Sequence, residues 1–577
     1  MELFRKIREK IKLSIWDYIE LVQRVLKNLT ILVSVFTMGV ILYYYGFPQN
    51  PQTQFFCNLV IHCSLLFYVF KYFVSAFFSV HSFNYIRKHW LEGAVILFII
   101  LGFIVSFNDI AMVLVQSYFF VLMLVELSYI GDFLGKIKIR PGGLLIISFL
   151  ILISAGTLLL LLPEMSTHGI SFIDALFTAT SASCITGLST LNMGTDFTFK
   201  GQFIILLLIQ LGGINIVCFA SFFTYFYKGG KLRSQSIMKE MLNTTLESSH
   251  SLTRAIVLYT FIIELIGFTF LFIHLNLTQI YSGVVSENVF LSAFHAIASF
   301  NNAGFCFLDG GMTNPLFRYD YYIQIVTMIL IFFGGIGFLT IHDVLSLPKG
   351  VKHKWKRLQI TSRVVLKLSV VFILFGAVSF FILEFNNASA GTSLSDRICT
   401  ALFTSISSRT AGFNTVDIPS LTMSTRLILL LLMLIGAAPG STSGGIKLTT
   451  FYILFKSALA TVYRKKQVTI YNRSISFETV DKSYVVLIFT IMLVLAGSFI
   501  LTLTDSQFSL EEIFFEVASA FGTAGVSSGV TPFLSTLGKF VITIIMYIGR
   551  ITVLTLALSI ARRAFARYSL AETNLGI

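Results

Sequence analysis

The amino-acid sequence predicts an all-α polytopic membrane protein: four pseudo-repeated units around one central axis, preceded by four extra transmembrane helices. Of its 577 residues, 55% are apolar and only 12% are charged, which excludes an ordinary soluble protein. Apolar runs of roughly 20 residues, enough to cross a ~30 Å hydrocarbon core, occur a dozen times. Near-copies of one segment, SASCITGLST, SFNNAGFCFL, SSRTAGFNTV and AFGTAGVSSG, recur at intervals of 117, 108 and 113 residues.

The N-terminal part precedes the repeats. Residues 1–28 are charged and amphipathic, so we expect a cytoplasmic segment lying on the membrane surface. A cleavable signal peptide would place its apolar stretch earlier, and none is expected. Four transmembrane helices are expected within 29–143, near 29–47, 54–79, 91–107 and 111–131. Because these helices lack regularly spaced arginines, they do not resemble a voltage sensor.

Each repeated unit is expected to contain a span, a half-helix, a glycine turn and a second span. The units occupy 144–232, 252–357, 358–466 and 480–567, with half-helices near 172–183, 288–301, 395–408 and 509–521. Their paired spans lie near 144–163 and 201–226, 252–275 and 322–346, 363–385 and 425–458, and 483–504 and 536–561. A half-helix of about 12 residues is too short to cross, and lipid tolerates irregular backbone only inside a bundle. The half-helices should therefore surround the axis.

Lysine and arginine lie mainly on one side of this topology. Of 42 such residues, 33 fall in segments that an alternating walk through twelve spans places on a single face. The positive-inside rule makes that face, and both termini, cytoplasmic. The net charge of +14 therefore reflects membrane orientation rather than nucleic-acid binding. The six cysteines are scattered without the spacing of a metal site.

The four glycine turns predict a selectivity filter for a monovalent cation in a central ion pore. An alkali ion must exchange its water shell for oxygens, and backbone carbonyls supply them without a fixed charge. Glycine permits the unusual backbone angles that this requires. One such glycine could merely cap a helix, but four equivalent copies favour a filter. The expected ion-binding residues are Ile185, Thr186, Gly187, Asn302, Ala303, Gly304, Thr410, Ala411, Gly412, Thr523, Ala524 and Gly525.

Residues 436–447, GAAPGSTSGGIK, interrupt the second span of the third unit. Glycine and proline do not sustain a continuous helix, so we expect a flexible loop below the filter whose polar groups face water. Lys447 would place positive charge near the cation route. Arg550 lies in an otherwise apolar span, where a buried arginine is a functional candidate by default. A structural arginine paired with a carboxylate or with carbonyls is the alternative.

These motifs resemble the Trk/Ktr/HKT superfamily of potassium transporters, of the bacterial Trk/Ktr type. The resemblance covers about 144–565 and rests on the filter segments, LIQLGGINI, GGIGF, IGAAPGSTSGGIKLTTF and MYIGRITVLTLAL. It implies potassium uptake across the cytoplasmic (inner) membrane, with potassium as the substrate and no cofactor in this chain. It also implies a homodimer with one pore per subunit and a cytoplasmic ring of nucleotide-binding regulatory subunits.

The same resemblance assigns roles to individual residues. It implies that the loop is an intramembrane gate, formed by Gly440, Ser441, Thr442, Ser443, Gly444, Gly445 and Lys447, with Arg550 as an electrostatic barrier. Glycine in the first filter goes with potassium selectivity and serine with sodium, so Gly187 implies potassium. The second filter departs from the family pattern, because Asn301 stands where relatives often have cysteine before Asn302.

Further candidates are the acidic Asp174, Glu384 and Glu516, the basic Arg409, and His295 and His342 with Asp343. Asp174 and Glu516 could concentrate cations or pair with Arg409, and Asp174 could equally cap a helix. Arg409 could instead brace its half-helix. The histidines are of the type used in proton relays, although a lone histidine in a packed helix is more often only hydrogen-bonded.

Several alternatives remain beside a gated potassium pore. The same fold could serve a sodium-permeable transporter or an ion-coupled (H⁺ or Na⁺) potassium symporter. An intramembrane enzyme would need a nucleophile–base or paired-carboxylate arrangement, which the sequence lacks, so no enzyme is expected. A transporter of organic solutes would show broken helices in two inverted halves. Because no nucleotide-binding motif occurs, regulation would need a partner.

Overall fold

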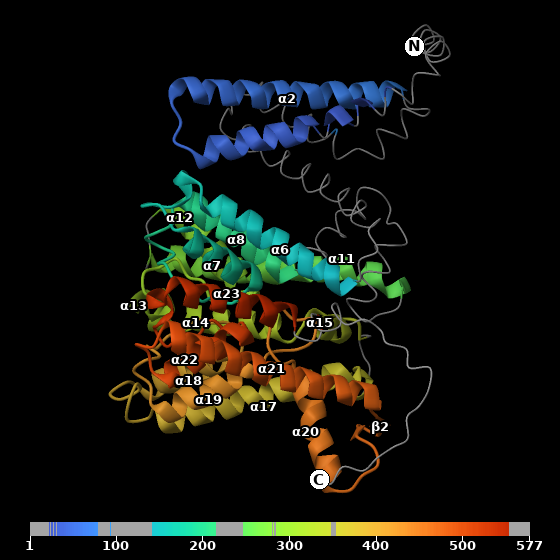
Figure 1. Cartoon of the computed structure of the whole chain (residues 1–577), viewed down its shortest axis with the longest axis vertical. Helices are drawn as coiled ribbons and strands as arrows, with labels where there is room; N and C mark the ends of the chain where they lie inside the picture. The colour runs from blue at the N-terminus through green and yellow to red at the C-terminus, as the bar shows by residue number, and fades with distance from the viewer. Residues whose placement is uncertain are drawn as a thin grey trace.

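The computed structural model describes residues 22, 25–26, 28–30, 32–78, 93, 141–214, 246–279, 281, 284–347, 354–552 and 555. Apart from one short β-hairpin, the regular elements in this part of the chain are helices (Figure 1), which confirms the predicted all-α fold. Five helices there are long and apolar enough to cross a membrane, and a bent pair makes a sixth. The expected span near 111–131, and nearly all of the span near 91–107 and of the surface segment 1–28, lie outside the described residues.

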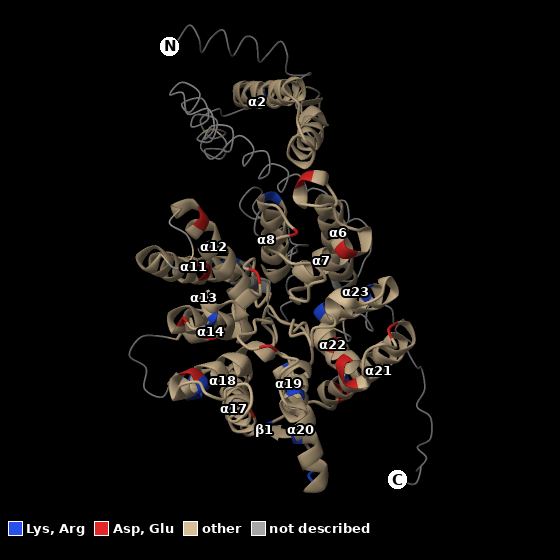
Figure 2. Cartoon of the chain, turned by 90° about the vertical axis from the view of Figure 1, so that its left-hand side faces the viewer, with Lys and Arg blue, Asp and Glu red and all other residues tan. Residues whose placement is uncertain are grey.

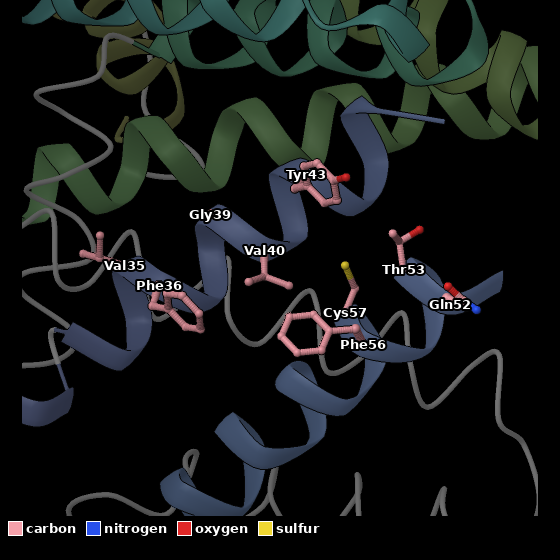
Figure 3. A pocket seen from close by; sticks show the side chains of 9 residues that line it. All are labelled: Val35, Phe36, Gly39, Val40, Tyr43, Gln52, Thr53, Phe56 and Cys57. Carbon is pink, nitrogen blue, oxygen red and sulfur yellow. The ribbon is translucent and has the colours of Figure 1, made fainter. Parts of the chain in front are cut away.

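The first two expected spans form a hairpin of helix Asn28–Gly46 and α2 (Pro51–Phe78). Hydroxyl groups join them: Thr37 Oγ1 donates to Ser64 Oγ at 2.7 Å. A groove of about 630 Å³, lined mostly by apolar side chains, lies between the two helices (Figure 3). The hairpin contacts the first unit through Lys200, whose Nζ donates to the carbonyl oxygen of Tyr45 at 3.3 Å.

The remaining helices form four units with the same order of elements. They are α6 (Pro141–Leu160), α7 (Phe172–Cys184) and α8 (Phe199–Ile214); α11 (Leu246–Thr278), α12 (Val285–Phe300), α14 (Tyr321–Gly335) and α15 (Phe338–Leu345); α17 (Ile360–Leu383), α18 (Leu394–Ser408), α19 (Met423–Leu434) and α20 (Leu448–Val462); and α21 (Phe477–Thr504), α22 (Leu510–Gly522) and α23 (Thr536–Ile551). Figure 2 shows the units in sequence order around a common centre. Each of the short helices α7, α12, α18 and α22 packs against both spans of its own unit.

Short elements connect these helices. They are η1 (Pro163–Met165), η2 (Gly311–Thr313), α13 (Pro315–Arg318), α16 (Lys354–Arg357), η3 (Thr531–Phe533), and the antiparallel strands β1 (Thr469–Ile470) and β2 (Arg473–Ser474). The β-hairpin follows α20 and carries exposed basic residues on the side that the charge distribution predicts to be cytoplasmic.

Three of the four short inner helices begin at a serine that is followed three residues later by an acid. The hydroxyls of Ser171, Ser393 and Ser509 accept hydrogen bonds from the backbone N–H groups of the acidic residues at 174, 396 and 512. Such caps satisfy free N–H groups, and the acids complement the positive end of the helix dipole. The opposite, carbonyl-bearing end of each helix points toward the centre.

The second spans touch the inner ends of these short helices at glycines. A β-carbon added to Gly334 would lie 1.9 Å from the carbonyl oxygen of Phe300. Equivalent additions would lie 2.0 Å from Ser183 O at Gly212 and 2.1 Å from Phe521 O at Gly549. Because no side chain fits into these gaps, the glycines set how closely the second spans approach the axis.

Buried carboxylates join the outer ends of the two spans in the third and fourth units. Glu384, at the end of α17, accepts hydrogen bonds from Thr422 Oγ1 at 2.7 Å and Thr425 Oγ1 at 2.6 Å. Asp505, at the end of α21, accepts from the backbone N–H of Ser535 at 2.6 Å and from its hydroxyl at 2.9 Å. Each carboxylate thereby holds the start of the following span.

One expected element differs in the structure. The sequence predicts a continuous span near 322–346, but α14 and α15 meet at an angle of 94°. The break follows Gly335, and Gly337 has a φ of +83°, a conformation that a non-glycine residue rarely adopts. The GGIGF segment therefore interrupts the second span of the second unit, as the glycine-rich loop interrupts that of the third.

We predict that Gly334→Ala destabilises the protein, because the new methyl group would have to displace a backbone carbonyl. Overpacking of this kind costs about 1–3 kcal/mol or more. Thermal unfolding of the purified protein in detergent measures the effect as a lower Tm and a loss of monodispersity.

Gly39→Ala is the matched control, since Gly39 is also helical but has no atom within 4 Å of the added β-carbon. It should leave Tm unchanged or slightly raised. Equal losses of Tm in the two variants would contradict the close contact between α14 and α12.

Candidate ion pathway

The four glycine turns meet in a closed ring. A β-carbon added to Gly187 would lie 2.6 Å from the carbonyl oxygen of Ala303, which precedes the glycine of the next unit. The same relation holds from Gly304 to Ala411 O at 2.7 Å, from Gly412 to Ala524 O at 2.9 Å, and from Gly525 back to Thr186 O at 2.1 Å. The chain thus visits the ring in sequence order, and each glycine contacts the backbone of its successor.

The turns depend on left-handed backbone conformations. The four ring glycines have φ values of +88°, +68°, +77° and +77°. In three units the residue two positions earlier is also left-handed: Ile185, Asn302 and Thr523 have φ of +58°, +58° and +47°. Thr410, at the equivalent place in the third unit, is not among the positive-φ residues. Such conformations are costly for non-glycine residues and persist only where the surrounding structure holds them.

Hydrogen bonds behind the turns hold these conformations. After α7, the N–H of Thr186 donates to Ser181 O at 2.8 Å. Ala303 and Ala524 make the same bond to Ala298 O and Ser519 O, at 2.8 and 2.9 Å. These bonds use N–H groups and leave the carbonyls of the turn residues free to face the axis.

A cavity of about 560 Å³ lies against the outer side of the ring and is lined by residues of all four units. Gly187, Gly304 and Gly412 form part of its wall, and Asp196 and Asp417 are the charged residues that line it. Two carboxylates without a lining lysine or arginine favour cations in this space. Sequence reasoning missed both aspartates, because each lies in a loop after its filter segment and has no motif of its own.

The acidic residues singled out from the sequence have other partners. Asp174 forms an ion pair with Lys539 at 2.8 Å rather than with Arg409. Glu516 is buried and accepts hydrogen bonds from Ser528 N at 2.8 Å and Thr531 Oγ1 at 2.7 Å, which holds the loop after the fourth filter. Neither carboxylate pairs with Arg409 or lines the cavity. The alternative role of Asp174 at the start of a helix is confirmed, because its backbone N–H donates to the capping hydroxyl of Ser171.

Arg409 is buried at the end of α18, and its Nε has no hydrogen-bond partner among the described residues. His295 lies buried between the rings of Phe317 and Phe413, and its Nε2 is 2.8 Å from Thr327 Oγ1. This packed setting suits a structural histidine.

His342 and Asp343 do not form one chain of hydrogen bonds. His342 contacts the hydroxyl of Tyr259 at 3.3 Å. Asp343 accepts from the backbone N–H of Gln359 at 2.8 Å. Their separate partners place them in packing contacts between α15 and its neighbours.

The glycine-rich loop between α19 and α20 lies directly against the ring residues. The N–H of Gly444 donates to Thr523 Oγ1 at 2.7 Å. The side-chain amide of Asn302 lies 3.2 Å from the hydroxyl oxygens of both Thr410 and Ser443. Gly440 and Gly445 both have φ of +69°, which gives the loop its sharp turns. Two ring turns therefore share hydrogen bonds with the loop.

Arg550 connects the loop to the first unit. Its guanidinium donates to the carbonyl oxygens of Thr442 and Gly212, the latter at 2.5 Å. Lys447 donates back to Ser443 O at 2.5 Å. The sequence left open whether Arg550 has a functional role or is a structural arginine paired with a carboxylate or with carbonyls. The structure shows carbonyl partners, one of which belongs to the loop.

The break between α14 and α15 pairs with the same loop. Phe338 N donates to Gly440 O, and Ala438 N donates to Gly335 O, both at 3.1 Å. A β-carbon on Gly337 would lie 2.8 Å from Pro439 O. Sequence reasoning did not find this contact. The three glycines of GGIGF were its signal, since a second glycine-rich break at the same depth is a natural partner for exposed backbone groups.

Comparison with known proteins identifies the family. Residues 110–566 match the family described as TrkH, cation transport protein. The Ktr system potassium uptake protein B of Bacillus subtilis is 36% identical over 74% of this chain and 94% of its own length. That of Vibrio alginolyticus is 35% identical over 75% and 94%. The potassium/sodium uptake protein NtpJ of Enterococcus hirae is 33% identical over 76% and 97%.

A solved structure supports the same assignment of fold. The potassium transporter TrkH from Vibrio parahaemolyticus matches with a TM-score of 0.59 at 19% identity, covering 74% of this chain and 86% of that one. The chain therefore belongs to the TrkH family of cation transport proteins, as its motifs predicted, and is a multi-pass membrane transporter rather than an enzyme.

We predict that Thr523→Val loosens the loop without removing the β-branched side chain. The buried N–H of Gly444 would lose its acceptor, which costs about 1–3 kcal/mol. Hydrogen–deuterium exchange of peptides covering 436–447 should become faster than in the wild type. Thr523→Ser keeps the hydroxyl and should exchange as the wild type does. Unchanged exchange in Thr523→Val would mean that this bond does not hold the loop.

Proposed function

We propose that this protein takes up potassium across the cytoplasmic membrane through a channel-like pore, with the ring of four glycine turns as its selectivity filter. The single observation that carries the proposal is the closed succession of contacts from Gly187 through Gly304 and Gly412 to Gly525. Four like-oriented short helices direct their carbonyl ends toward this ring. The relatives named potassium uptake proteins support potassium as the transported ion.

The chemistry of the filter follows from the turn geometry. A potassium ion at the ring exchanges part of its water shell for main-chain oxygens, which carry no net charge and release the ion again. The filter has one glycine per unit, so it is short and offers few stacked sites. The acidic cavity on its outer side raises the local cation concentration.

The glycine-rich loop is the gate in this proposal. It contacts ring residues on one side and Arg550 on the other, so its position controls the path below the filter. Arg550 both anchors the loop through Thr442 and places a positive charge beside the route of the cation. Displacing the loop would move Lys447 and open the path.

The proposal includes partners and a location. The protein would be a homodimer in the cytoplasmic (inner) membrane, with both termini in the cytoplasm and a ring of nucleotide-binding regulatory subunits on that face. Support comes from the exposed basic segment after α20, which includes Arg464, Lys465 and Lys466. Because this chain contains no nucleotide-binding motif, regulation by nucleotide would have to act through such a partner.

A second candidate is a sodium-permeable or ion-coupled potassium transporter of the same fold. The observation that favours it is the 33% identity to a protein named a potassium/sodium uptake protein. Uptake of labelled rubidium into proteoliposomes, with and without sodium and proton gradients, separates the two. Uptake that proceeds without either gradient supports the pore, whereas dependence on one of them supports coupling.

We predict that Gly187→Ser weakens the preference for potassium over sodium. The serine β-carbon would lie 2.6 Å from Ala303 O at a φ of +88°, so the ring must widen. A loss of about 1.4 kcal/mol in discrimination corresponds to a tenfold lower selectivity ratio. The measurement is rescue of a potassium-uptake-deficient bacterium on low potassium, followed by rubidium uptake in the presence of increasing sodium.

Gly169→Ser is the control, because Gly169 has a φ of +74° but no atom within 4 Å of an added β-carbon. It carries the same backbone strain outside the ring and should rescue growth with unchanged selectivity. If Gly187→Ser kept the selectivity of the wild type, the ring would not be the selectivity filter. If the wild type failed to rescue growth, the protein would not take up potassium.

We predict that Arg550→Gln raises unregulated rubidium flux while leaving the potassium-to-sodium ratio intact, because the loop loses an anchor but the ring keeps its backbone. Flux is measured in proteoliposomes without a regulatory partner. Arg397→Gln is the control: Arg397 also donates to a carbonyl, that of Thr392 at 3.2 Å, but at the outer end of α18. A change in selectivity, or no change in flux, would contradict the role of the loop as gate.

A further inference from the structure

Three of the four junctions between neighbouring units are joined by an acid at the outer end of a short inner helix. Each acid lies in the first turn of its helix and contacts a residue near the start of the second span of the preceding unit around the ring. The pairs are Asp174 with Lys539, Asp396 with the hydroxyl of Tyr321, and Glu511 with Arg426. The units are therefore tied to one another at their outer ends as well as at the glycine turns.

The junction between the first and second units lacks such a tie among the described residues. Glu287 lies in the first turn of α12, but it is exposed, and none of the ion pairs in the described part of the chain includes it. Lys200, at the start of α8, pairs instead with Glu164 of its own unit at 3.0 Å. The rings of Phe199 and Phe290 meet across this junction, with centroids 4.5 Å apart. Glu287 is thus an untied acid with which the tied ones can be compared.

Arg426 and Glu511 form the tie between the third and fourth units. Arg426 Nε lies 3.2 Å from Glu511 Oε1. Because this nitrogen makes no hydrogen bond among the described residues, the attraction is between the two charges. The neighbouring Glu512 accepts hydrogen bonds from the backbone N–H and the hydroxyl of Ser509 within its own helix, which leaves Glu511 to reach across to α19. Both partners are partly exposed, at 20% and 32%, so either charge can be reversed without being buried.

The same two helices, α19 and α22, also meet at their inner ends. A β-carbon added to Gly522 would lie 2.3 Å from the carbonyl oxygen of Met433. Gly522 is the last residue of α22, and the fourth ring turn begins at the next residue, Thr523. From Glu511 to Gly522 the helix rises over 11 residues, or about 17 Å at 1.5 Å per residue. A helix held against its neighbour at both ends keeps its tilt, whereas one held only at Gly522 can pivot there.

A change in the tilt of α22 acts directly on the ring. A β-carbon added to Gly525 would lie 2.1 Å from Thr186 O, so the fourth turn is in close contact with the first. α19 leads into the glycine-rich loop, where the N–H of Gly444 donates to Thr523 Oγ1 at 2.7 Å. The outer ion pair, the inner backbone contact and this hydrogen bond together hold α19, α22 and the loop as one assembly.

We propose that Arg426 and Glu511 are positioning residues of the selectivity filter: the attraction between them fixes the tilt of α22 against α19, and so the place of the fourth turn in the ring. Neither side chain touches the ion. The inference rests on the proposed function, because it assumes that the ring selects the permeant ion. It assigns part of the selectivity to a pair of charges at the far end of the helix that carries the turn.

Charge reversal tests the tie. In Glu511→Lys and in Arg426→Glu two like charges face each other, and the double variant restores an opposite pair in reversed order. Rubidium uptake into proteoliposomes in the presence of increasing sodium gives the selectivity ratio, and thermal unfolding gives Tm. We expect each single reversal to lower the ratio about three- to tenfold. The double reversal should return it to within about twofold of the wild type.

Glu287→Lys is the matched control, since it makes the same change of charge in the first turn of an inner helix at the junction without a tie. It should leave the selectivity ratio unchanged. An equal loss in Glu287→Lys, or no recovery in the double reversal, would overturn the inference. So would opposite shifts of KM in the two single reversals at an unchanged ratio, which is the result expected if the charges act only through their field at the mouth of the pore.

Neutral variants keep the inference testable if a reversal prevents folding. Arg426→Gln and Glu511→Gln should each lower the ratio about twofold. The double neutral variant should lose no more than either single one, because the tie can be broken only once. A wild-type ratio with a lower Tm would mean that the pair only stabilises the fold, which overturns the inference. Absence of rubidium uptake by the wild type would instead refute the proposed function, so the two failures are distinguishable.

Discussion

The contact on which this structure depends is the approach of four backbone turns to within van der Waals distance of one another around a single axis. Each ring glycine lies against the carbonyl-bearing residue of the next turn, and any β-carbon there would collide with it. That contact requires glycine at four positions. In three of the four turns it also requires a left-handed residue two positions before the glycine. The short helices, their caps and the second spans all serve to hold these turns in place.

A second set of glycines makes this approach possible. Gly212, Gly334 and Gly549 let the second spans lie against the carbonyl ends of the inner helices, so the helix ends cannot move away from the axis. In the third unit the span is broken instead, and its Gly436 lies against Gly444 O within the loop. Three of the four units therefore share this contact between a second span and the end of a short helix, and the third unit does not. The unit that departs from the pattern carries the loop.

The loop is held by groups from two other units and is linked to a third. Arg550 and Thr523 belong to the fourth unit, and Asn302 and the GGIGF break belong to the second. Arg550 also donates to Gly212 O, which links the loop to the first unit. A segment with so many backbone bonds to separate elements has a defined position, and it can change position only if several of those bonds exchange together. This suits a two-state element better than a freely mobile one. Glu264 and Gln210 extend the same network outward to α11 and α8.

The sequence alone determined the fold class, the four repeated segments and their family. The length of an apolar run and a glycine-containing repeat can both be read from neighbouring residues, without knowing how the helices pack. It also placed the four short helices to within three residues, since serine caps and glycine ends are local signals. Only the tertiary structure decided which charged groups meet: Asp174 with Lys539, Asp196 and Asp417 at the cavity, and Glu264 with two amides. Such partners lie tens to hundreds of residues apart, and their pairing depends on how the units close into a ring, which no local pattern encodes.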